Sequence, residues 1–208
     1  MGLSCLIDPT APVVVDASTV INLNATACGP RILKAIPNPF IITDVVQGEL
    51  LEDHRSGRQD GRLVAELVGA GLISVAKLDD LTESHFEDLV IGRGDATLDD
   101  GEAATIAYGM EKGAITLIDE RKATRLTRER YPRLTVGNSL DVLSHSAVFA
   151  ELGHDGTADA VFNALRLARM RVPPATLEWV VTLIGRKRAA VCECLPRRYR
   201  VTQEIPTK

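Results

Sequence analysis

Four carboxylates stand out in the sequence because each occupies a place where a parallel α/β sheet puts its functional side chains. Asp16 directly follows a run of three valines, and Asp119 follows a second apolar run. Glu49 lies one or two turns into the segment after a third apolar run, and Glu102 opens the segment before Asp119. Carboxylates and water are the ligands that Mg²⁺ and Mn²⁺ prefer, so the four acids predict one shared metal site.

A simpler interpretation assigns each acid to helix capping, because Asp and Glu are common at helix starts. Asp16 is expected to be the least cap-like of the four, since Ser18 or Thr19 is available as the cap. Asp100 is a rival for the role given to Glu102. Clustered carboxylates without a cation repel each other and resist joint ionisation, which favours the metal interpretation for the set as a whole.

The elements that must position these acids alternate along the chain, which is typical of crossover units and a parallel sheet with helices on both faces. Strands are expected at 13–15, 40–42, 72–76, 114–118 and 134–136. Helices are expected from about 18 to 23, 31–36, 45–50, 62–68, 83–91, 101–110, 121–130, 140–152, 156–170 and 174–185, with a turn at 92–95.

The ordered acidic motifs resemble those of the PIN-domain family, over roughly residues 13–152. The matching segments are VVVDAS (13–18), VQGEL (46–50), DGEA (100–103) and TLIDE (116–120). The resemblance implies a three-layer α/β/α sandwich around a parallel sheet of four to five strands, followed here by C-terminal helices and a basic tail. It also implies an endoribonuclease that depends on Mg²⁺ or Mn²⁺.

Carried over position by position, the resemblance makes Asp16, Glu49, Glu102 and Asp119 both the catalytic residues and the metal ligands. Ser18 matches the hydroxyl that follows the first acid. Many family members place a Thr, Ser or Asn after the last strand, where this chain has Asn138, and both residues are expected to support the site. Many small bacterial and archaeal members are VapC-type toxins, so the expected partners are RNA, a protein antitoxin and a second copy of the chain in a homodimer.

The helix after Asp119 is basic on one face. Arg121, Arg125 and Arg128 fall at positions i, i+4 and i+7, and Lys122 lies beside them. Arg121, Lys122 and Arg125 are therefore candidates for binding RNA phosphates next to the metal site. The alternative is a solvated face that pairs with neighbouring glutamates.

The expected organisation is a lead-in at 1–12, a PIN-like nuclease domain at 13–152 and a helical extension with a basic tail at 153–208. The net charge is −4. Residues 185–208 nevertheless carry seven Lys and Arg side chains against two Asp and Glu. An acidic body excludes nucleic-acid binding by overall charge, so contact with RNA must use local patches or metal ions.

Other classes fit the sequence less well. Four cysteines without a CxxC pair indicate neither a disulfide scaffold nor a zinc site. No apolar run is long enough for a membrane span, and no secretory signal opens the sequence, so a cytoplasmic protein is expected. One alternative is a non-catalytic RNA-binding or regulatory module on the PIN fold. Another is an aspartyl phosphotransferase with Asp16 as nucleophile, in which Ser18 stands where a second Asp is usual.

Overall fold

The computed structural model describes residues 4–52, 59–91 and 97–200; the predicted turn at 92–95 lies outside them. The described chain forms a five-stranded sheet in the order β3-β2-β1-β4-β5, and every neighbouring pair is parallel. The strands are β1 (Val13–Val15), β2 (Phe40–Thr43), β3 (Ser74–Ala76), β4 (Ile115–Leu117) and β5 (Val136–Gly137).

The central strand β1 is built from three valines, which are fully buried. β-branched side chains suit a strand that is covered on both faces. Val13 is paired with Phe40 on one side and with Ile115 on the other. Because all the strands run the same way, their carboxyl ends share one edge of the sheet, where β1 leads into Asp16 and β4 leads towards Asp119.

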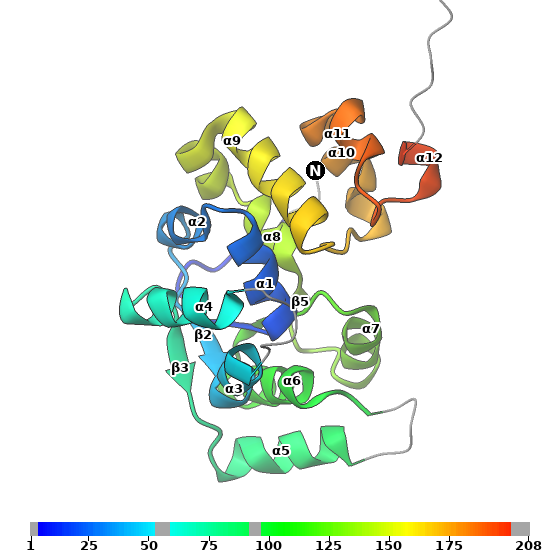
Figure 1. Ribbon diagram of the computed structural model, residues 1–208. Coiled ribbons are helices and arrows are strands. Elements are labelled where there is room, and N and C mark those ends of the chain that lie inside the picture. The colour runs from blue at the N-terminus through cyan, green and yellow to red at the C-terminus, as the bar shows by residue number, and fades with distance from the viewer. Residues whose placement is uncertain (1–3, 53–58, 92–96, 201–208) are drawn as a thin grey trace, which may run out of the picture.

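Helices connect the strands and cover both faces, as Figure 1 shows. In the first part of the chain they are α1 (Ala17–Ala25), α2 (Gly29–Ala35), α3 (Asp44–Glu52), α4 (Asp60–Gly69), α5 (Asp80–Val90), α6 (Asp100–Lys112), α7 (Arg121–Arg130) and α8 (Ser139–Leu143). After them come α9 (Ser146–Leu167), the 3-10 turn η3 (Pro174–Thr176), α10 (Leu177–Ile184), α11 (Arg186–Ala190) and α12 (Arg197–Arg200).

Two hydrophobic cores flank the sheet. Leu117 belongs to the larger core, whereas the next residue, Ile118, belongs to a smaller core with side chains of α5, α6 and α7. Successive side chains of an extended segment point to opposite faces, so the two cores lie on opposite sides of the sheet. The predicted three-layer α/β/α sandwich with a parallel sheet is confirmed.

Several predicted boundaries were wrong. α5 begins at Asp80, three residues early, because the Asp79 side chain caps it by accepting from the Thr82 amide at 3.1 Å. The helix predicted at 140–152 is divided: α8 ends at Leu143 and α9 starts at Ser146. The predicted break before residue 156 is confirmed, because Gly153, at φ 69° and ψ 177°, is non-helical and divides α9 into two helical segments.

The C-terminal helices α9 to α12 gather at the end of the molecule opposite α5 (Figure 1). The larger core includes both Leu6 and Leu195, so it draws side chains from the lead-in and from the extension. The Cys5 amide donates to Asp141 of α8 at 3.0 Å. The proposed boundaries after residues 12 and 152 stay predictions. Across the described ranges, no helix is long and apolar enough to cross a membrane.

Candidate active site

Asp16 occupies the junction between β1 and α1. Its amide donates to Leu117 of β4 at 3.2 Å. Its carboxylate accepts from the Thr19 amide at 2.8 Å and from the Ser18 hydroxyl at 2.7 Å. Asp16 is therefore the N-cap of α1, and the prediction that Ser18 or Thr19 takes that role was wrong.

Capping does not remove Asp16 from the candidate site, because the side chain is buried and faces other acids. Asp16 is only 3% exposed. Burial, followed by the negative charge of Asp119, raises the pKa of Asp16 to about 7. The hydrogen bonds from Thr19 and Ser18 act in the opposite direction but do not compensate.

Asp119 follows β4 and is held by donors from two other segments. Its carboxylate accepts from Asn22 Nδ2 at 2.9 Å and from the Ser139 amide at 3.2 Å. The Ser139 hydroxyl also donates to it, and Thr19 Oγ1 lies at 3.4 Å. Burial raises the pKa of Asp119 even though these hydrogen bonds favour the ionised form.

Asn22 and Ser139 were missed in the sequence. Asn22 is one turn after Thr19 on α1, so the two side chains share a helix face towards Asp119. Ser139 follows the predicted supporting residue, Asn138. Asn138 itself caps α8 by accepting from the Leu140 amide at 2.9 Å, whereas its neighbour provides the contacts to Asp119.

Glu102 lies in the first turn of α6, where Asp99 is the N-cap and accepts from the Glu102 amide at 2.9 Å. The residue is 8% exposed. Burial raises the pKa of Glu102 to about 8, with further contributions from the charges of Asp99, Glu120 and Asp16. Its rival Asp100 is exposed, so Glu102 is the acid that turns towards Asp16.

Glu49 approaches the same turn of α6 from α3. Its carboxylate accepts from the Gly101 amide at 2.9 Å. A side chain at position 101 would collide with this carboxylate, so the close approach requires glycine. Burial and then the charge of Asp99 raise the pKa of Glu49.

The four predicted acids influence one another around the carboxyl edge of the sheet, three of them through their charges and Glu49 through a hydrogen bond to α6. Asp16 feels the charge of Asp119, and Glu102 feels the charge of Asp16. Glu49 is linked to them through the first turn of α6. Within the described ranges, no three His, Cys, Asp or Glu side chains are already placed as a set that could hold a metal ion. The shared metal site therefore stays a prediction.

The chemistry of the donor set nevertheless fits a hard divalent cation. The donors are carboxylate oxygens, and Asp16, Glu102 and Asp119 are all nearly buried. No Lys, Arg or His of the described chain forms an ion pair with any of these three. Buried carboxylates that lack a cationic partner have raised pKa values, and a cation would relieve the cost of ionising them.

The predicted RNA-binding residues lie on α7, which begins immediately after Glu120. Arg121 is exposed, and Lys122 is half-buried. Arg125 pairs with Glu129 at 3.2 Å, as the solvated-face alternative expects. Arg128, the third arginine on the basic face of α7, instead lines a pocket of about 560 Å³ between α7 and the segment before α10.

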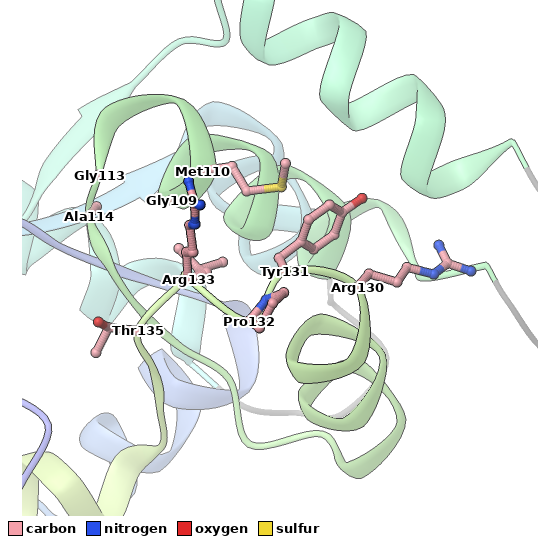
Figure 2. A pocket seen from close by; sticks show the side chains of 10 residues that line it. Gly109, Met110, Gly113, Ala114, Arg130, Tyr131, Pro132, Arg133 and Thr135 are labelled. Carbon is pink, nitrogen blue, oxygen red and sulfur yellow. The ribbon is translucent and has the colours of Figure 1, made fainter.

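A second hollow, of about 410 Å³, lies away from the acids at the far end of α6. Figure 2 shows its lining, which includes Met110 of α6 and, just after α7, Tyr131 and Arg133. None of the four predicted acids lines it. It lies near the start of β4 rather than at the strand carboxyl ends, where parallel sheets place their reactive groups.

Fold and site together define a nuclease-like α/β/α protein with acids at the carboxyl edge of a parallel sheet. A family model described as a PIN domain (DUF3368) matches residues 12–186, and the chain belongs to the PIN-domain family. PIN domains are generally nucleases and usually use divalent metals. Neither the curated proteins nor the solved structures include a match to the chain.

Proposed function

We propose that this protein is a divalent-metal-dependent endoribonuclease and the toxin component of a toxin–antitoxin pair. The observation that carries the proposal is the set of buried acids Asp16, Glu102 and Asp119 on a PIN domain. Each has a raised pKa. Such groups are common where a protein binds cations or performs catalysis, because a purely structural core does better with apolar side chains.

Asp16, Glu102 and Asp119, with Glu49 as a fourth acid, would hold Mg²⁺ or Mn²⁺. Such an ion, when bound, polarises a phosphate and lowers the pKa of water. The protein's own contribution is orientation. Donors from α1 and from the start of α8 hold the Asp119 carboxylate, while the first turn of α1 holds that of Asp16. Pre-positioned carboxylates lose little freedom when substrate and cation arrive.

A ribonuclease that cleaves cellular RNA needs an inhibitor, and a toxin–antitoxin pair provides one. The acids have no cationic partner within the described chain, and a protein inhibitor that presents arginine would supply one, because a guanidinium can engage two carboxylate oxygens at once. The proposed partner is such an antitoxin, acting in the cytoplasm where RNA is the substrate. A homodimer is proposed as the working form of the enzyme.

A cleavage assay tests the nuclease step. Purified protein is incubated with labelled single-stranded RNA and Mn²⁺, alongside Asp119→Asn, which keeps the size of the side chain but removes its charge and one acceptor oxygen. Cleavage by the wild type and its loss in the variant would support the proposal. A wild type that leaves every RNA intact, or a variant that cleaves equally well, would contradict it.

Expression in the native host tests the toxin step separately. The wild type should arrest growth when produced without its partner, and Asp119→Asn at an equal protein level should not. Normal growth with the wild type, despite cleavage in the test tube, would remove the toxin role and keep the nuclease.

The second candidate is a non-catalytic RNA-binding or regulatory module on the same fold. It is favoured by the position of Glu49, whose carboxylate is occupied by the Gly101 amide and lies under the influence of Asp99 and Asp100. In such a protein the acids would shape the fold rather than serve a reaction. RNA binding without cleavage, at the same affinity in the wild type and Glu49→Gln, would support it.

A further inference from the structure

The C-terminal extension forms one wall of the pocket that contains Arg128, here called the interface groove. Its core wall includes Arg128 of α7 and Asn138 at the start of α8, and its other wall includes Arg171 and Trp179. The groove has a volume of about 560 Å³. The two walls come from segments far apart in the sequence, so the groove exists only when the extension is docked.

The interface groove reaches the backbone on which the candidate active site is built. Arg171 Nη1 donates to the Asp119 carbonyl oxygen at 3.1 Å. Thr124, another residue of its wall, donates to the Ile118 and Glu120 carbonyl oxygens at 3.3 and 2.6 Å. The walls of the groove are therefore tied to the segment that carries Asp119, although none of the four predicted acids lines the groove itself.

The groove carries two cationic groups that suit phosphates. Arg128 donates one hydrogen bond to the Val136 carbonyl oxygen at 3.4 Å, and Arg171 donates one to the Asp119 carbonyl oxygen. A guanidinium has five N–H donors, so each retains donors for a phosphate oxygen. Among the described residues, neither forms an ion pair with a carboxylate.

Two carboxylates also line the groove, but both have other hydrogen-bond donors. Asp141 accepts from the Cys5 and Asn138 amides at 3.0 and 2.9 Å. Glu178 accepts from the hydroxyl of Tyr199 in α12. These contacts fix the two carboxylates at the walls of the groove. The two arginines still have N–H donors that bind no protein acceptor.

Trp179 adds an aromatic surface to the same groove. The residue is half-buried, and its ring meets Phe149 edge-on at a centroid distance of 6.3 Å. Alternating cations and aromatic rings are the usual way in which proteins bind single strands without base pairing, with phosphates on the cations and bases stacked on the rings.

We infer that the interface groove binds the single-stranded RNA segment next to the scissile phosphate, with Arg128 and Arg171 on phosphates and Trp179 against a base. This inference rests on the proposed function for the nature of the ligand. It assigns the C-terminal extension a role in substrate binding. It also transfers RNA contact from Arg125, which is paired with Glu129, to Arg128.

Trp179 is the only tryptophan of the chain, which provides a direct probe. The protein carrying Asp119→Asn, which prevents cleavage during the measurement, is titrated with a short unlabelled single-stranded RNA in Mn²⁺ while indole fluorescence is recorded. RNA seated in the groove should quench the fluorescence. Binding detected by anisotropy of a labelled RNA, without any change in indole emission, would overturn the inference.

Charge variants supply the second measurement, in the same Asp119→Asn protein. Arg128→Gln and Arg171→Lys are compared with Arg62→Gln on α4, a control whose exposed arginine pairs with Glu66 and lies outside the groove. Arg128→Gln should weaken RNA binding by roughly tenfold at low salt and reduce the slope of log affinity against log salt by about 1. Arg171→Lys keeps the charge but loses the planar fork, so it should weaken binding with little change in slope. Arg62→Gln should do neither.

Equal affinities and slopes for the Arg62 and Arg128 variants would exclude the groove. The failure of the proposed function looks different. Quenching and a changed slope together with no RNA cleavage by the wild type would leave the groove in place and remove the nuclease. RNA cleavage by Arg128→Gln and Arg171→Lys with the KM of the wild type would keep the nuclease and exclude the groove.

Discussion

The two ends of helix α6 differ in their electrostatics and in the space around them. At its first turn, the Gly101 amide donates to Glu49, and Glu102 lies among acids whose charges help to raise its pKa. At its other end, Met110 lines an open hollow of about 410 Å³ that none of these acids reaches. The more spacious region has the simpler electrostatics, so the open hollow and the carboxylates with raised pKa values lie at opposite ends of the helix.

The largest difference between the two ends should appear in catalysis. Glu102→Gln keeps the shape of a buried side chain but removes a charge from the metal-binding set. We expect RNA cleavage to fall by at least about a hundredfold, as for loss of a group that stabilises the transition state. Rates with Mn²⁺ under single-turnover conditions measure the effect.

Met110→Ala at the other end of the same helix is the control and should retain most of the activity. Asp100→Asn distinguishes the rival acid. If Asp100→Asn were inactive while Glu102→Gln cleaved RNA normally, the third acid would have been assigned to the wrong residue.

The second-largest difference between the two ends of α6 should appear in the effect of metal on the melting temperature. Mg²⁺ or Mn²⁺ binds a cluster that exists only in the folded state, so saturating metal should raise the melting temperature by about 5–10 °C. Calorimetry with and without EDTA measures this. Asp16→Asn should lose most of the increase, whereas Met110→Ala should keep it. A wild type whose melting temperature ignores both ions would contradict the metal site.

Stability as a function of pH provides a smaller effect of the same origin. In the folded protein the pKa of Asp16 is about 7 and that of Glu102 about 8, whereas in the unfolded chain they lie near 3.8 and 4.5. Between these values the folded state binds more protons, so the free energy of unfolding of metal-free protein falls as pH rises from about 4 to about 8.

Asp16→Asn should flatten this dependence and raise the melting temperature at pH 8 by on the order of 5 °C. The substitution suits the local structure because Asn is also a good helix N-cap. Thermal unfolding in EDTA across the pH range provides the comparison. A wild type that becomes more stable towards pH 8 would show that these carboxylates ionise without cost.

The smallest expected effect concerns the contact between Glu49 and α6. Gly101→Ala would displace the Glu49 carboxylate and break its hydrogen bond to the amide, a loss of about 1 kcal/mol that offsets the gain from placing alanine in a helix, so the free energy of unfolding should change little. Gly48→Ala is the matched control in α3, since a methyl group there meets no atom within 4 Å. It should stabilise the protein by about 0.5–1 kcal/mol. Equal stabilisation by both substitutions would argue against the Glu49 contact.

Much of the fold was predictable because its signals are local. Apolar runs gave the strands, Gly113 ends α6 in a left-handed conformation at φ 63°, and α7 has the predicted bounds. The kink at Gly153 also followed from the sequence, whereas the division between α8 and α9 did not, because Ser144 and His145 include neither glycine nor proline.

The candidate site was predictable only as a set of charged residues. The sequence shows which acids follow strands, but the donors to Asp119 arrive from Asn22 and Ser139, which are far away in the chain. Arg171 was equally hidden, because nothing in its neighbourhood indicates that it reaches the Asp119 carbonyl oxygen. Contacts of this kind depend on tertiary packing.

The order of the strands has a consequence for synthesis on the ribosome. The central strand β1 is made first but is flanked by β4, so Asp16 must wait for Asp119 and Ser139 before its surroundings exist. At roughly 5–20 residues per second, that wait lasts on the order of ten seconds. The interface groove is completed later still, when Arg171 and Trp179 have emerged. Nascent chains therefore carry the first acid through most of translation without a working arrangement around it.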